Sequence, residues 1–292
     1  MLAEIATLAF ALLLGLAFGS FLNVCIARLP SGESVVTPRS HCRSCNAPLR
    51  KRDNIPLLSY LLLRGRCHAC GAPIPIRYPL VEVATAIWFA LSALPLARLL
   101  ADPASSGDAL LASAVHFVAM AVLGFLLIGL AVMDWTDPRP TGYLPNEFTL
   151  GGLAAGIFFT FAESFFVPPV AVKTLFTPEE VFIAHRLLAA LLGFLVLWLI
   201  RTVYRLVRKR PGMGAGDARL LAMMGSFLGL APLCVAFLVG TGLAAIVGAA
   251  LLVTRRGTAA TPLRYGSFLA VGGLFAALWG DRLATWYLSL FR

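Results

Sequence analysis

The chain has 292 residues, of which 59% are hydrophobic and only 13% are charged. A soluble domain needs more charged side chains to cover its surface, so this composition excludes the ordinary soluble classes and indicates an integral membrane protein. The formal net charge of +10 is compatible with a nucleic-acid partner. The positions of the basic residues favour membrane topology and contact with anionic lipid instead.

Eight apolar stretches are candidates for membrane-spanning helices, since a bilayer core of about 30 Å needs roughly 20 apolar residues per span. They cover residues 4–26, 80–100, 110–133, 148–167, 182–204, 218–230, 233–253 and 268–290. The sixth is the shortest, and Pro232 is expected to mark the turn after it. No alternation typical of a membrane barrel is present, so we expect an all-α membrane protein with about eight transmembrane helices.

The basic residues predict the orientation of these helices. Nineteen of the 24 Lys and Arg residues fall in loops on one side of an eight-span arrangement. Cytoplasmic loops carry such an excess, so we expect these loops inside the cell and both termini outside. Residues 1–4 carry no Lys or Arg and Arg28 follows the first apolar stretch, so we interpret that stretch as a retained helix rather than a secretory signal.

The loop between the first two apolar stretches carries two Cys-x-x-Cys pairs. The four residues are Cys42, Cys45, Cys67 and Cys70. Two such pairs form a tetrahedral thiolate set suited to zinc, and four thiolates leave no open position, so the metal is expected to be structural. The neighbouring His41 and His68 are possible substitute ligands. Lasting disulfides are the alternative, which a reducing cytoplasm disfavours.

Two aspartates stand at the predicted cytoplasmic boundary of the membrane. Asp134 directly follows the third apolar stretch, and Asp217 ends a glycine-rich segment and opens the sixth. Acidic residues at this depth are candidates for function. If their helices pack together, the pair can share one proton, so that one member activates a water and the other hydrogen-bonds a peptide carbonyl. The alternative is that each acid only caps or ends its helix.

Several segments, taken together, resemble the type IV prepilin peptidase family. The sequence GSFLNV at 19–24, followed by Arg28 and Pro30, is similar to the family's opening signature. NIPLLSYLLLRG at 54–65 and RYPLVE at 77–82 resemble its cytoplasmic block. GAGD at 214–217, continued by RLLA at 219–222, resembles the Gly-x-Gly-Asp signature of intramembrane-type aspartyl proteases. The similarity is dense over 15–89, 124–150 and 212–229.

The resemblance implies a bifunctional enzyme of the bacterial inner membrane. It would remove the basic leader of type IV prepilins or type II secretion pseudopilins after a glycine at the cytoplasmic face, with Asp134 and Asp217 as the catalytic pair. It would then methylate the new N-terminal residue using S-adenosylmethionine. Residues 1–27 would form the first helix, 28–78 the zinc-binding and methyltransferase region, and 79–292 the peptidase. Glu82 is the candidate acidic partner of the substrate amine, or else only a polar helix end.

One departure from the family pattern concerns the first aspartate. The family places a Leu-Pro-Asp or Leu-Pro-Asn element shortly after it, whereas here Leu144-Pro145-Asn146 follows a longer segment. That segment contains Asp137, which is therefore a rival for the catalytic role. We favour Asp134 because it adjoins the apolar stretch.

Two other kinds of protein remain alternatives at this stage. A proton-coupled transporter could use Asp134 and Asp217 as a relay, which predicts acids near the middle of the membrane and repeated halves. A non-catalytic membrane anchor could use the zinc loop to recruit a partner, which leaves the glycines before Asp217 unexplained.

Overall fold

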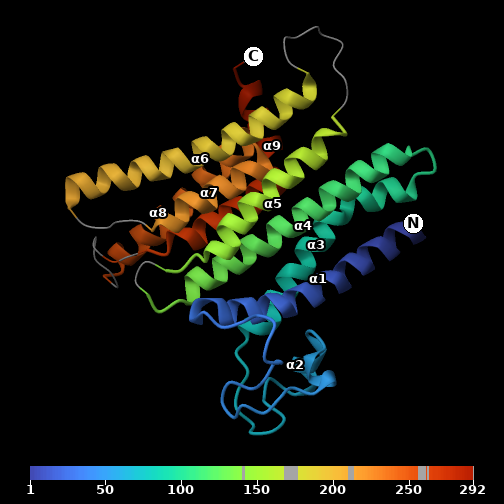
Figure 1. Cartoon of the computed structure of the whole chain (residues 1–292), viewed down its shortest axis with the longest axis vertical. Coiled ribbons are helices and arrows are strands. Elements are labelled where there is room, and N and C mark those ends of the chain that lie inside the picture. Colours follow the sequence, from blue (N-terminus) through green and yellow to red (C-terminus); the bar gives the residue numbers. More distant parts are fainter. Residues whose placement is uncertain (140–141, 168–176, 210–213, 256–260, 262, 292) are drawn as a thin grey trace. The chain divides into compact units, whose positions relative to one another are not determined.

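The computed structural model describes residues 1–139, 142–167, 177–209, 214–255, 261 and 263–291, and within them it contains helices and no strand (Figure 1). The helices are α1 (Leu2–Arg28), α2 (Leu58–Leu62), α3 (Arg77–Ala101), α4 (Gly107–Thr136), α5 (Asn146–Ser164), α6 (Pro178–Arg208), α7 (Ala215–Leu228), α8 (Leu230–Val253) and α9 (Tyr265–Ser289). Two short 3-10 turns, η1 (Leu29–Ser31) and η2 (Lys51–Asn54), lie in the loop before α3. The all-α prediction is confirmed.

Each predicted span corresponds to one helix, but eight membrane crossings are not confirmed. Among the residues that the structure describes, five helices are long and apolar enough to cross a bilayer, namely α1, α3, α4, α6 and α8. Helix α7 has only 14 residues, fewer than the roughly 20 that a span requires. Its side chains Leu220, Met223, Met224 and Phe227 are fully buried, so α7 is surrounded by protein.

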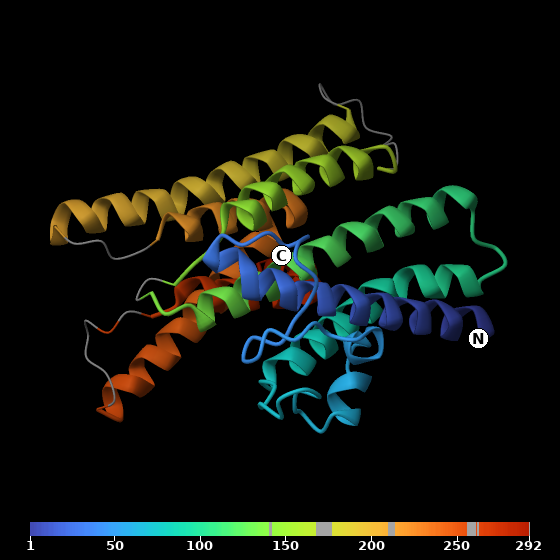
Figure 2. The ribbon, with the colours of Figure 1, turned by 60° about the horizontal axis from the view of Figure 1, so that its bottom comes forward.

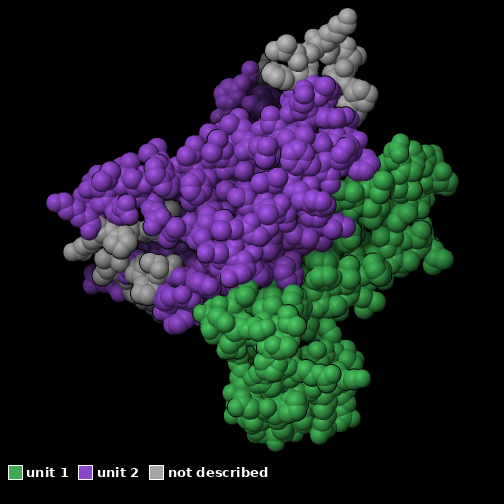
Figure 3. Space-filling view, viewed as in Figure 1, with its two compact units in different colours: residues 1–117 green, residues 118–292 purple. Residues whose placement is uncertain are grey.

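The chain forms two compact units, residues 1–117 and 118–292, coloured separately in Figure 3. In unit 1, α1 packs along α3. A Cβ atom placed on Gly15 would lie 2.6 Å from Ala86 Cα, and one on Gly19 would lie 2.7 Å from Glu82 Cα. Small residues thus let the two backbones approach closely, as is usual between membrane helices. The loop between α1 and α3 lies at one end of this pair (Figure 1).

In unit 2, the short helix α7 lies against α5 and α6, and α8 pairs with α9 (Figure 2). The hydroxyl of Thr160 on α5 donates to the Ser226 carbonyl on α7 at 2.7 Å. Gly225 lets α7 approach the α6 backbone, since a Cβ there would lie 2.7 Å from the Ala189 carbonyl oxygen. The buried helix is therefore held on two sides.

The turn between α7 and α8 differs from the prediction. Gly229, with φ of +79°, makes this turn. Pro232 lies in the first turn of α8, where a proline is tolerated because the N–H groups there have no partner within the helix. The expectation that Pro232 marks the turn is therefore wrong by a few residues.

Candidate active site and four-cysteine segment

Asp134 lies in the last turn of α4 and is 2% exposed. Its Oδ2 accepts hydrogen bonds from the backbone N–H of Ser267 at 2.7 Å and from the Ser267 hydroxyl at 2.9 Å. Ser267 is the third residue of α9, and its N–H is one of the donors that a helix start leaves unpaired. The positive end of α9 therefore holds this carboxyl group.

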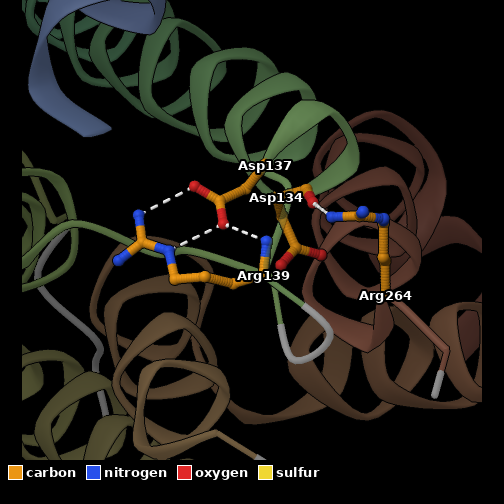
Figure 4. A network of polar contacts seen from close by, with 4 residues as sticks. All are labelled: Asp134, Asp137, Arg139 and Arg264. Carbon is orange, nitrogen blue, oxygen red and sulfur yellow. Dashed lines mark hydrogen bonds and ion pairs between the residues drawn. The ribbon is translucent and has the colours of Figure 1, made fainter. Parts of the chain in front are cut away.

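The main chain at the end of α4 is bound from the same segment. Arg264, just before α9, donates to the Asp134 carbonyl oxygen at 2.5 Å (Figure 4). A basic side chain at this position satisfies a terminal carbonyl and complements the negative end of α4. Arg264 and Ser267 thus fix Asp134 through its main chain and its side chain.

Asp217 is the third residue of α7 and is 6% exposed. Its carboxyl group accepts a hydrogen bond from the backbone of Gly214, the residue that caps α7. This contact is one half of a capping box, so the helix-capping interpretation is correct as a description of the local structure. Capping leaves the rest of the carboxyl group available for other contacts.

The two carboxyl groups meet at Gly266. A Cβ atom placed on this glycine would lie 3.0 Å from Asp217 Oδ1 and 3.2 Å from Asp134 Oδ2. Asp217 Oδ1 and Asp134 Oδ2 are therefore no farther apart than the sum of their two distances from this Cβ position. Although 83 residues separate Asp134 from Asp217 in sequence, the fold brings them to one point, close enough to act on a common water.

Asp137, the other candidate for the first catalytic aspartate, forms an ion pair with Arg139. Its carboxylate is bound by Arg139, through Nε at 2.7 Å and through a terminal nitrogen at 2.8 Å (Figure 4). These hydrogen bonds lower the pKa of Asp137 and outweigh its burial. Arg139 in turn lies over the Tyr143 ring at 4.0 Å. Asp137 is thus part of an ion pair beside α4.

A polar cavity of about 260 Å³ adjoins Asp217. Its lining comes from residues 142–147 and from the start of α7. Leu144 lines this cavity and packs against the start of α7, because a Cβ on Gly216 would lie 2.7 Å from Leu144 Cβ. Arg219 is hydrogen-bonded to Asn146, which ties the start of α5 to α7. This cavity is large enough for part of an extended peptide backbone.

The four cysteines converge as their spacing predicts. The Sγ atoms of Cys42, Cys45, Cys67 and Cys70 all lie within 4.8 Å of one another. The Cys42–Cys70 sulfur distance is 3.9 Å, close to the roughly 3.8 Å that tetrahedral zinc–sulfur geometry requires and far from a disulfide bond. All six cysteines of the chain are free. The donor set fits one structural metal ion.

Both cysteine pairs are built from the same turn. The backbone N–H of Cys42 donates to the Ala47 carbonyl, and that of Cys67 donates to the Ala72 carbonyl. The fourth residue after each, Asn46 and Gly71, has φ of 56° and 71°. Glycine and asparagine adopt this left-handed conformation most readily, so the local sequence suits the turn.

The pKa values of two of these thiols are shifted by their neighbours. Backbone N–H groups of Ser44 and Cys45 lower the pKa of Cys42 to about 6. At Cys70 the backbone N–H of Ala72 lowers the pKa, but the neighbouring Cys45, Cys67 and Cys42 outweigh it and raise the pKa to about 11. Four thiolates this close repel one another, and a bound cation would relieve the repulsion.

Glu82 lies in unit 1, on the first turns of α3, and is 8% exposed. Its Oε2 accepts a hydrogen bond from the Leu57 backbone N–H at 2.7 Å. It lines a second, larger cavity beneath the cysteine pairs, described below. The aspartate pair belongs to unit 2 and Glu82 to unit 1.

Sequence reasoning missed Arg264, Gly266 and Ser267, all at the start of α9. The resemblance is weak in this part of the chain, and a short Gly-Ser pair opening an apolar stretch carries little signal alone. Only contacts across more than a hundred residues reveal that this helix start completes the site.

Comparison with known proteins decides the family. A sequence profile described as "Bacterial Peptidase A24 N-terminal domain" matches residues 13–96, and one described as "Type IV leader peptidase family" matches residues 121–250. A prepilin leader peptidase/N-methyltransferase of Aeromonas hydrophila is 34% identical, over 96% of this chain and 93% of the relative. The chain belongs to the type IV leader peptidase family.

Other relatives carry the same name. That of Pseudomonas aeruginosa is 32% identical over 95% of this chain and 92% of its own length, and that of Klebsiella pneumoniae is 36% identical over 75% and 84%. No solved structure matches the chain. Family membership makes the chain a multi-pass inner-membrane enzyme, an aspartic-type peptidase with methyltransferase activity, and gives the transporter alternative no support.

Proposed function

We propose that Asp134 and Asp217 are the catalytic pair that removes the basic leader of type IV prepilins or type II secretion pseudopilins. The observation that carries this proposal is the convergence of both carboxyl groups on Gly266, from α4 and α7, beside a polar cavity. Two acids at this separation can share a proton and act together on one water.

The surroundings of the two acids support a different role for each. Asp134, which receives two hydrogen bonds from Ser267 at the positive end of α9, is set up as the proton acceptor. It takes a proton from water as that water attacks the carbonyl carbon of the scissile bond. Asp217 accepts a backbone hydrogen bond from Gly214, so it is the member that donates a hydrogen bond to the carbonyl oxygen. The ion pair of Asp137 with Arg139 supports Asp134, rather than Asp137, as the proton acceptor.

The substrate is proposed to approach from the cytoplasm. Arg205 and Arg208 lie in the last turn of α6, and Arg255 follows α8. Arg264 immediately precedes α9 and donates to the Asp134 carbonyl oxygen. The positive-inside rule then gives a cytoplasmic active site and periplasmic termini. A prepilin with its apolar helix in the membrane would present the bond after its leader glycine at this depth.

The second proposed activity is methylation of the new N-terminal residue, with S-adenosylmethionine as the methyl donor. We assign it to the region 28–78, where the four cysteines hold a structural Zn²⁺ that orders a loop with few apolar residues. A bound donor would supply an electrophilic methyl group. The peptidase chemistry lies within 79–292.

Leader removal from a prepilin in membranes tests the peptidase proposal. Asp134→Asn and Asp217→Asn are each expected to abolish cleavage, while Asp137→Asn serves as the matched control and retains it. Cleavage persisting in either of the first two variants would exclude the mechanism.

A further inference from the structure

One cavity of unit 1 has no part in the peptide cleavage described above. It has a volume of about 560 Å³ and lies between the ends of α1 and α3 and the two cysteine pairs. Ser20, Asn23, Val24 and Ala27 form one face of α1 along its wall, since they recur at helical spacing. A cavity of this size is within the range that encloses a cofactor-sized molecule.

An unpaired acceptor on α1 belongs to a residue that lines this cavity. Asn23 is 3% exposed, and its Nδ2 donates to the Tyr78 carbonyl oxygen at 2.9 Å. A carbonyl oxygen can only accept, which fixes the orientation of the amide and identifies Oδ1 as the atom without a partner. Asn23 Oδ1 is buried and has no hydrogen-bond partner in the protein. Buried polar atoms are almost always paired, so this atom calls for a ligand.

A carboxylate without a cation lies on the facing helix. Glu82 Oε2 is bound by the Leu57 N–H, and the Ser20 hydroxyl also hydrogen-bonds this side chain, but within residues 1–117 no basic group pairs with it. Two of the nearby guanidinium groups are engaged elsewhere. Arg28 donates to the Ser34 and Pro38 carbonyl oxygens, and Arg43 donates to that of Ala27. Arg77, which also lines the cavity, lies 5.3 Å from the Tyr78 ring centroid, and its buried Nε has no hydrogen-bond partner among the described residues.

The packing of α1 on α3 places these two acceptors in one corner. Gly19 of α1 lies against the Glu82 backbone, where an added Cβ would be 2.7 Å from Cα. Ser20 and Asn23, the next residues on that face, therefore border Glu82. A charged and a neutral oxygen acceptor, both buried and both on residues that line one cavity, favour a ligand with a positive charge and several N–H donors. A primary ammonium has both properties.

We propose that Asn23 and Glu82 form an amine-binding subsite that positions the new N-terminus of the cleaved substrate inside this cavity. The inference rests on the methyltransferase part of the proposed function. The ammonium group would lose one proton to the Glu82 carboxylate. The freed nitrogen lone pair would form a bond to the methyl carbon, and the carbon–sulfur bond would break with its electrons going to sulfur. The products would be a methylated ammonium and a neutral thioether.

The same acceptors could instead recognise the sulfonium charge of the methyl donor. Binding measurements distinguish this ligand from the substrate amine. The full chain in detergent would be titrated with a mature pilin N-terminal peptide, either free or acetylated at its amine. It would also be titrated with S-adenosylmethionine and with S-adenosylhomocysteine, which lacks the sulfonium charge. Cleavage and methylation would be measured on the same preparations by mass spectrometry.

Glu82→Gln and Asn23→Leu test the subsite, and Thr85→Val is the matched control, since Thr85 is a fully buried α3 residue that does not line the cavity. We expect wild type and Thr85→Val to prefer the free amine by about tenfold, the scale of one charge-assisted hydrogen bond. Glu82→Gln should lose this preference and methylate at least about tenfold more slowly, with cleavage retained. Asn23→Leu should weaken both effects in the same direction.

Three outcomes would overturn the inference or its basis. A free-amine preference that survives in both variants contradicts the subsite. Loss of only the preference for S-adenosylmethionine over S-adenosylhomocysteine shows that the corner recognises the donor instead. Failure of the wild-type chain to methylate any cleaved substrate is a different result, because it refutes the methyltransferase proposal itself.

Discussion

Gly266 separates the two aspartates, and adding a single methyl group there should disturb cleavage without harming the fold. In Gly266→Ala the new Cβ would lie 2.9 Å from Leu144 Cδ1, 3.0 Å from Asp217 Oδ1 and 3.2 Å from Asp134 Oδ2, whereas ordinary contact begins at 3.4 Å. Because the new Cβ would be too close to three different side chains, no single side chain can relieve the overlap by moving. Both carboxyl groups must shift by a few tenths of an ångström.

The size of the effect follows from the precision that catalysis needs. A displacement of about 1 Å costs roughly a hundredfold in rate, so shifts of a few tenths in both acids should slow cleavage by about tenfold. Stability should not fall, since alanine is favoured over glycine in helices by up to about 1 kcal/mol. Gly151→Ala in α5 is the matched control, because nothing lies within 4 Å of the position its Cβ would take.

The assay is single-turnover cleavage of a prepilin in proteoliposomes, with thermal unfolding measured in parallel. We expect Gly266→Ala to be slow and as stable as wild type, and Gly151→Ala to match wild type in both respects. Equal cleavage rates for the two variants would refute the placement of the acids around Gly266.

Three further predictions concern the groups around the two sites. Ser267→Ala removes one hydroxyl donor to Asp134 and leaves the backbone donor, so cleavage should slow by about three- to tenfold; an unchanged rate would contradict the positioning role. Asp137→Asn breaks an ion pair whose Arg139 side chain is 48% exposed, so it should lower the free energy of unfolding by no more than about 1 kcal/mol at neutral pH. Because the folded pKa of Asp137 is depressed, that contribution should be present above the ordinary aspartate pKa of about 3.9 and vanish as the pH falls through the folded value, which denaturant titrations across pH would measure. Chelation of the metal, or Cys42→Ser, should expose the loop between α1 and α3 to limited proteolysis and reduce methylation more than cleavage; an unaltered digestion pattern would count against a structural metal.

The four-cysteine site was predictable because its geometry is local. Each Cys-x-x-Cys pair makes its own turn, completed by Asn46 or Gly71 four residues after the first cysteine, so spacing alone indicates where the thiols point. The helices were predictable for a similar reason, since the length and apolarity of a segment determine whether it can lie in a bilayer. The family was also recognisable, because its signatures are contiguous stretches of sequence.

Tertiary structure decided the rest. Asp134 and Asp137 are both acids near the end of one helix, and only Arg139 and Ser267 show which of them is bound in an ion pair and which faces Asp217. The short helix α7 resembles a span in sequence because burial in protein and burial in lipid select the same apolar residues. The start of α9 became part of the site only through contacts made across 133 residues, which a single sequence does not encode in any local pattern.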